Sequence, residues 1–232
     1  RTGAVVLSAL STVAAFAMVA TGVGLALQAR PAHVAILAGA AGLGAVTVLP
    51  WVAVRLARLP MPVIPTSPDQ LRDASLGVDF AQAGARAAVA AEYLDGTTIG
   101  CAVVAAAGAV MSLAAGTVFA VLFGAVVVTA LLLRVRSVSS RLARLGLIVA
   151  GLLAAALGLA GAVLAAPEQA VVIAGTVLVL TGIAVLLTVF VPRRQLSPMT
   201  GRSIDIAENI VLVSVLPLAL GAVDLYATVR HW

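Results

Sequence analysis

The sequence contains no lysine, a single cysteine and little charge of either sign. Only 10% of its 232 residues are charged, whereas soluble domains average about 25%. A chain with so little polar surface is excluded as an ordinary soluble domain. The lone cysteine, Cys101, excludes an internal disulfide and a metal site built from several cysteines. It lies in an apolar run, where we expect it to be a small packing residue.

Patterns that carry chemistry are missing as well. The sequence shows no Ser/His/Asp set, no glycine-rich phosphate loop and no His/Glu metal pattern. The two histidines, His33 and His231, are far apart, and neither has a partner at ligand spacing. We therefore expect no enzymatic activity and no cofactor.

What the chain does contain is a series of apolar runs of about 20 residues, each long enough to cross a hydrocarbon core of about 30 Å. Hydrophobic residues make up 62% of the sequence, and the mean hydropathy is +1.18. This pattern predicts an all-α, polytopic transmembrane bundle that occupies residues 1–232 as one transmembrane domain. The seven expected spans are about 4–27, 34–54, 97–114, 117–133, 145–166, 170–191 and 208–229.

The number of spans between residues 97 and 133 follows from length. This run has 37 residues and no charge, so one helix would be about 55 Å long. Ordinary tilt cannot absorb nearly twice the hydrocarbon thickness. We therefore predict two spans here, with a tight turn near Gly116.

The arginines set the expected orientation. All fourteen basic residues are arginine and nearly all flank apolar runs, which favours a role in topology over nucleic-acid binding. Two spans in 97–133 place twelve arginines on one side of the membrane and two, Arg30 and Arg230, on the other, whereas one span gives six and eight. The positive-inside rule then places residue 1 in the cytoplasm and the C-terminus outside. The arginines expected at the membrane interface are Arg134, Arg136, Arg141, Arg144, Arg193, Arg194 and Arg202.

Residues 55–96 form the only long polar interval, which this topology makes a cytoplasmic loop. It holds five of the nine acidic residues and four of the ten prolines. The prolines stop the preceding helix after Arg58 and favour an extended path. With four arginines its net charge is −1, which favours a protein partner over lipid headgroups. The residues expected to bind a partner are Arg58, Pro60, Pro62, Pro65, Asp69, Arg72 and Asp73.

The end of this interval has helical periodicity. Apolar residues recur at three- and four-residue spacing from Phe80 to Leu94, opposite Gln82, Arg86 and Glu92. This spacing predicts an amphipathic helix that leads into the third span. Docking to a protein and lying on the membrane surface both remain open for this helix.

Acidic and small residues within the spans complete the picture. Asp224 is the one carboxylate expected well inside a span, and structural or interfacial pairing is favoured over a proton or substrate site. Asp205 and Glu208 are expected at the N-terminus of the last span, where a carboxylate suits the helix dipole. Small residues indicate close helix packing, within this chain or between subunits. They include Gly22, Gly24, Gly39, Gly42, Gly44, Gly151, Gly158 and Gly161.

Three passages resemble a known family. They are LARLPMPVIPT at Leu56–Thr66, PRRQLSPMTGRSIDIAE at Pro192–Glu208 and VLPLALGAVDLYATVR at Val215–Arg230. With the span pattern, they resemble EccD, a membrane subunit of the type VII (ESX) secretion systems of mycobacteria and related actinobacteria. That family has a cytoplasmic ubiquitin-like domain and eleven spans, so the chain corresponds to its last seven. The chain opens at Arg1 without a methionine, and we expect the domain and first spans to be missing.

The resemblance implies a non-enzymatic subunit of the bacterial plasma membrane. It implies a dimer assembled with EccB, EccC and EccE, in which EccC hydrolyses ATP and the loop at 55–96 holds EccC and EccB. The leading hypothesis is thus a scaffold or channel-forming subunit of a protein-secretion complex. The alternative is a secondary transporter that uses Asp224, although no internal repeat supports it.

Overall fold

The computed structural model describes residues 2–56, 80–165, 167–168, 170–190 and 198–225. This part of the chain contains seven α-helices and no strand, which confirms the all-α class. The helices are α1 (Thr2–Leu27), α2 (Pro31–Leu56), α4 (Phe80–Ala115), α5 (Val118–Arg134), α6 (Arg141–Ala165), α7 (Ala170–Phe190) and α8 (Pro198–Ala222).

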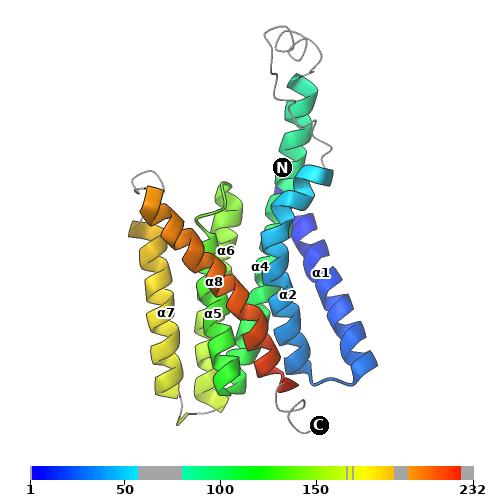
Figure 1. Ribbon diagram of the computed structural model, residues 1–232. Coiled ribbons are helices and arrows are strands. Elements are labelled where there is room, and N and C mark those ends of the chain that lie inside the picture. The colour runs from blue at the N-terminus through cyan, green and yellow to red at the C-terminus, as the bar shows by residue number, and fades with distance from the viewer. Residues whose placement is uncertain (1, 57–79, 166, 169, 191–197, 226–232) are drawn as a thin grey trace.

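The helices run alternately up and down the bundle, so α1 begins at one end and α8 finishes at the other (Figure 1). Five of them are long and apolar enough to cross a membrane, and Val118–Arg134 and Ala170–Leu186 are shorter apolar helices. The chain is a multi-pass membrane protein. We call the end where α2 and α5 finish and α4, α6 and α8 begin the arginine-rich end, because Arg134, Arg136, Arg141, Arg144 and Arg202 lie there.

The predicted turn near Gly116 is confirmed. Gly116 has a φ of 71°, a left-handed conformation that glycine adopts without steric cost. Thr117 then caps α5, and its side-chain oxygen accepts a hydrogen bond from the Ala120 backbone N–H at 3.4 Å. The uncharged run is therefore divided between two antiparallel helices.

The amphipathic segment and the third span form one continuous helix, α4, of 36 residues. At 1.5 Å per residue α4 is about 54 Å long, well beyond the hydrocarbon thickness. Its first turns project past the other helices at the arginine-rich end (Figure 1). The predicted amphipathic helix is thus the exposed beginning of a membrane-spanning one.

The last helix differs from the expected 208–229. It begins at Pro198, ten residues earlier, and ends at Ala222. Proline suits the first helical position because the amide hydrogen it lacks has no partner there. Asp224 follows with a φ of 58°, a left-handed conformation that aspartate tolerates at a helix end.

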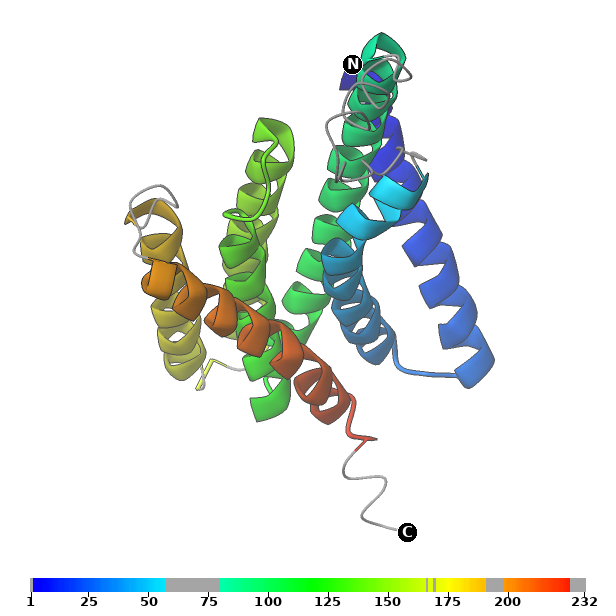
Figure 2. The same cartoon turned by 45° about the horizontal axis from the view of Figure 1, so that its top comes forward.

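Helix α4 lies at the centre of the bundle, in contact with α1, α2, α5 and α6. Figure 2 shows α8 crossing obliquely over α5 toward the beginning of α2. The interior is filled by apolar side chains from several helices, with Phe123, Leu113, Leu131, Leu147 and Ile36 among the largest that are fully buried. Cys101 is also buried in α4, as expected of a packing residue.

Glycines allow α2 and α4 to approach each other closely. A Cβ built on Gly39 of α2 would lie 2.9 Å from the Cα of Gly108 in α4, and a Cβ on Gly42 would lie 3.0 Å from the Cys101 carbonyl oxygen. Both contacts are between backbones, which only glycine permits at this separation. By contrast, Gly22 and Gly44 face open space. Helix packing within the chain therefore explains only some of the glycines in the expected spans.

Candidate functional site

The polar residues that the structure describes form no cluster that could hold a metal ion. No group of three or more His, Cys, Asp or Glu side chains comes together among these residues. Two sets of polar contacts join helices at the arginine-rich end, one around Arg134 and one at Asp95.

Arg134, the last residue of α5, forms an ion pair with Glu208 of α8. Its Nη1 lies 3.0 Å from Glu208 Oε1, and the two side chains are only 15% and 12% exposed. Removal from water makes such a pair costly to break, because the remaining charge has no compensation. The pair therefore fixes α8 against α5.

The second Arg134 contact depends on a proline. Its Nη2 donates to the backbone carbonyl of Val46 in α2 at 3.4 Å. Within a helix that carbonyl would accept the amide hydrogen of residue 50, but residue 50 is proline and has none. Arg134 thus satisfies a carbonyl that Pro50 leaves without its helical partner. One guanidinium holds α2, α5 and α8 together.

A second polar contact joins α4 to the start of α6. The Ser140 hydroxyl donates to Asp95 Oδ2 at 2.5 Å, and its oxygen accepts from the Ala143 backbone N–H at 3.5 Å. Ser140 is therefore the N-cap of α6, and the Asp95 carboxylate lies near the positive end of that helix. The two polar contacts together tie five helices at one end of the bundle.

The remaining interface arginines are placed as follows. Arg136 is half-buried, and Arg141, Arg144 and Arg202 are exposed. Arg144 Nη2 donates to the Val138 carbonyl at 3.1 Å, which closes the α5–α6 link. Arg193 and Arg194 lie outside the described residues.

The residues expected to bind a partner lie outside the described part of the chain too. They are Arg58, Pro60, Pro62, Pro65, Asp69, Arg72 and Asp73. The structure does describe the helices on either side, because α2 ends at Leu56 and α4 begins at Phe80. The C-terminus of α2 and the N-terminus of α4 are both at the arginine-rich end, so the segment that joins them starts and finishes there.

Three acidic residues differ from the sequence expectation. Asp224 does not lie within a helical span but past the end of α8, where it is exposed. Asp205 and Glu208 are not at a helix N-terminus, because α8 begins at Pro198, and the Glu208 side chain pairs with Arg134. Sequence reasoning missed this pair. The available signal was that Glu208 lies beside one apolar run and that Arg134 directly follows another apolar run.

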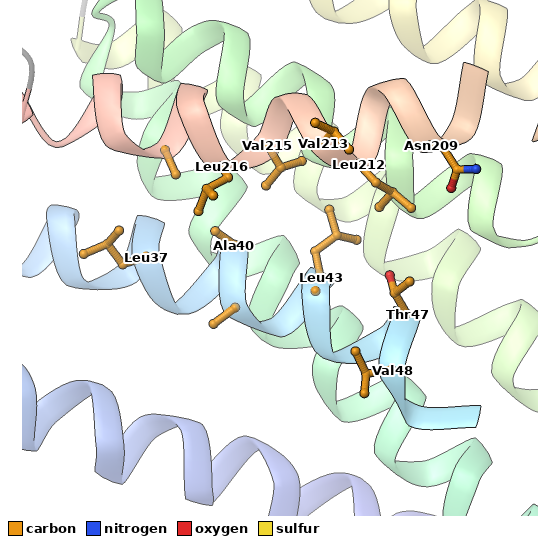
Figure 3. Close-up of a pocket in the computed structure, with 13 residues that line it drawn as sticks. Leu37, Ala40, Leu43, Thr47, Val48, Asn209, Leu212, Val213, Val215 and Leu216 are labelled. Atoms are coloured by element: carbon orange, nitrogen blue, oxygen red, sulfur yellow. The ribbon is translucent and has the colours of Figure 1, made fainter. Parts of the chain in front are cut away.

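A groove between α2 and α8 lies next to the Arg134–Glu208 ion pair. Its volume is about 540 Å³, and its walls are almost entirely apolar. The lining residues are Leu37, Ala40, Ala41, Leu43, Gly44, Thr47, Val48, Asn209, Leu212, Val213, Val215, Leu216 and Ala219. Figure 3 shows the polar side chains of Thr47 and Asn209 at one end of the groove and Leu37 and Leu216 toward the other.

Comparisons with known proteins agree with the fold. The chain is similar to a solved structure titled "Structure of protomer 1 of the ESX-3 core complex", with a TM-score of 0.69 and 18% sequence identity. The similarity covers 97% of this chain and 52% of that one, so the chain spans about half the length of the protein it matches. A comparison with curated protein sequences finds no match. The family described as the EccD-like transmembrane domain matches residues 1–232, and the chain therefore belongs to that family.

Proposed function

We propose that this chain is the transmembrane part of a non-catalytic scaffold or channel-forming subunit of a type VII protein-secretion complex. The observation that carries the proposal is the match of the EccD-like transmembrane domain over the whole chain. The similar ESX-3 protomer supports it at the level of the fold. The proposed partners are EccB-, EccC- and EccE-like subunits, membrane lipids and a second copy of the chain.

In this proposal, the segment between α2 and α4 docks the ATPase and neighbouring subunits. Its two ends are held by helices whose backbones touch at Gly39 and Gly108. The segment therefore leaves and re-enters the bundle on two helices that pack against each other. Prolines within the segment further restrict the chain. Both effects lower the conformational entropy lost when a partner binds.

The proposed orientation places the arginine-rich end in the cytoplasm of the bacterial cell. Arg134, Arg136, Arg141, Arg144 and Arg202 lie at that end, and Arg30 precedes α2 at the other. This asymmetry fits the positive-inside rule. The ATPase-binding segment would then face the compartment that supplies ATP.

The transporter alternative depended on a carboxylate inside a span. Asp224 is exposed beyond the end of α8, so it does not supply that group. Glu208 pairs with Arg134, and Asp95 accepts a hydrogen bond from Ser140, both at the arginine-rich end. The scaffold proposal is therefore the one we develop.

Reversing the charge of Asp69 and Asp73 tests the docking role. We expect at least about tenfold less ATPase to co-purify with the Asp69→Arg/Asp73→Arg variant of the full-length protein than with the wild type. This loss corresponds to about 1.4 kcal/mol of binding free energy. The measurement is affinity purification of the complex with quantification of each subunit.

Glu168→Arg is the control, because this exposed residue lies in the α6–α7 link at the opposite end. It also replaces an acidic side chain by arginine, and we expect normal recovery of the ATPase. Full retention of the ATPase by the Asp69→Arg/Asp73→Arg variant would remove this segment from the contact.

A further inference from the structure

We propose that the groove between α2 and α8 binds one acyl chain of a membrane phospholipid, with the headgroup at the arginine-rich end. The inference requires only that the helices lie in a bilayer and does not depend on the docking role proposed above. The groove is lined by the thirteen residues named with Figure 3.

The length of the groove matches half a bilayer. Its lining runs from Leu37 to Val48 along α2 and from Asn209 to Ala219 along α8. At 1.5 Å per residue these stretches are about 16 Å and 15 Å long. A hydrocarbon core of about 30 Å gives about 15 Å for each leaflet. A chain from one leaflet would therefore fill the groove from end to end.

The groove has a volume of about 540 Å³ over a length of about 16 Å. A helix with its side chains is about 10–12 Å across, so it would lie over the mouth of the groove. A single acyl chain, one methylene wide, can enter.

The polarity of the groove gives the direction of the lipid. Only Thr47 and Asn209 among the lining residues have polar side chains, and both lie at the same end. Each directly follows in sequence a member of the Arg134 contact, Val46 or Glu208. The polar end is thus next to charged groups, where the ester linkages of a phospholipid would find hydrogen-bonding partners.

Charges on α8 continue this polar end. Arg202 and Asp205 precede Asn209 by seven and four residues, which places them on the same side of the helix. Both are exposed, and Arg202 is about 10 Å beyond Asn209 along the axis. Their opposite charges fit the phosphate and the ammonium of a zwitterionic aminophospholipid. The geometry therefore favours phosphatidylethanolamine over a strongly anionic lipid.

Gly44→Leu tests the groove, because Gly44 lines it and an added side chain there meets no atom within 4 Å. Leucine would occupy the space of the acyl chain. Gly175→Leu is the matched control, since Gly175 of α7 is also exposed with nothing within 4 Å but lies away from the groove. Ala41→Leu, at another exposed lining residue, replaces Gly44→Leu if that variant does not fold.

The experiment is native mass spectrometry of the full-length protein, purified in mild detergent and supplied with phosphatidylethanolamine. We expect one tightly retained lipid per chain in the wild type and in Gly175→Leu, and its loss in folded Gly44→Leu or Ala41→Leu. Equal lipid retention in all variants would overturn the proposal. So would the absence of a retained lipid in the wild type, or cross-linking of a protein helix through the groove.

Discussion

Replacing Arg134 by leucine is expected to lower the unfolding temperature of the purified protein by roughly 6–12 °C, from a loss of about 3 kcal/mol. Glu208 would remain as a mostly buried carboxylate without its partner. The Val46 carbonyl would also lose its donor, and Pro50 prevents the helix from supplying another. The measurement is thermal unfolding followed by intrinsic fluorescence in detergent.

Three companion variants separate the contributions. Arg134→Leu/Glu208→Leu should be more stable than Arg134→Leu alone, because no charge is left uncompensated. In a Pro50→Ala background the loss of Arg134 should cost about 1 kcal/mol less, because Val46 regains a helical partner. Arg141→Leu removes an exposed arginine and should change stability by at most about 0.5 kcal/mol. If Arg134→Leu unfolded at the same temperature as Arg141→Leu, the proposed joining of three helices would be wrong.

Replacing Gly39 by leucine should have an effect at least as large. Even a Cβ at Gly39 would lie 2.9 Å from the Cα of Gly108 and 3.4 Å from the Ala105 carbonyl oxygen. Because these are backbone atoms, no side chain can rotate to make room, and α2 must move away from α4. We expect a loss of about 3 kcal/mol or more, at or above the upper range for overpacking. Recovery of folded monodisperse protein, measured by size-exclusion chromatography, should fall sharply.

Gly22→Leu is the matched control for this change. Gly22 lies in α1 with nothing within 4 Å of an added Cβ, so leucine there would extend into open space. Yield and elution should match the wild type. Normal recovery of Gly39→Leu would show that the α2–α4 contact is looser than the structure has it.

Much of the fold follows from lengths that can be read in the sequence. The uncharged run at 97–133 is too long for one span, and the structure divides it at Gly116 as that argument requires. The period of apolar residues from Phe80 likewise predicts a helix, which α4 contains. These inferences succeed because they depend on local spacing and on the thickness of the bilayer alone.

The Arg134 contact could not be derived in the same way. Arg134 and Glu208 are separated by 74 positions, and Val46 is 88 positions from Arg134. Their meeting depends on how obliquely α8 crosses α5 (Figure 2), which no local pattern determines. The expected position of Glu208 at a helix N-terminus was wrong because α8 begins before the apolar run does. The prediction that Asp224 lies inside a span was wrong for the converse reason, because the apolar sequence continues past the end of α8.

The central claim is that a bundle embedded in the bilayer presents the segment between α2 and α4 to the cytoplasm. Cysteine labelling in intact cells tests it directly, because the one native cysteine, Cys101, is only 2% exposed and gives little background. In the full-length protein, a membrane-impermeant maleimide should label Glu168→Cys in intact cells. It should reach Ser67→Cys only after the membrane is permeabilised. Labelling of Ser67→Cys in intact cells, with Glu168→Cys protected, would contradict the orientation and the docking role together.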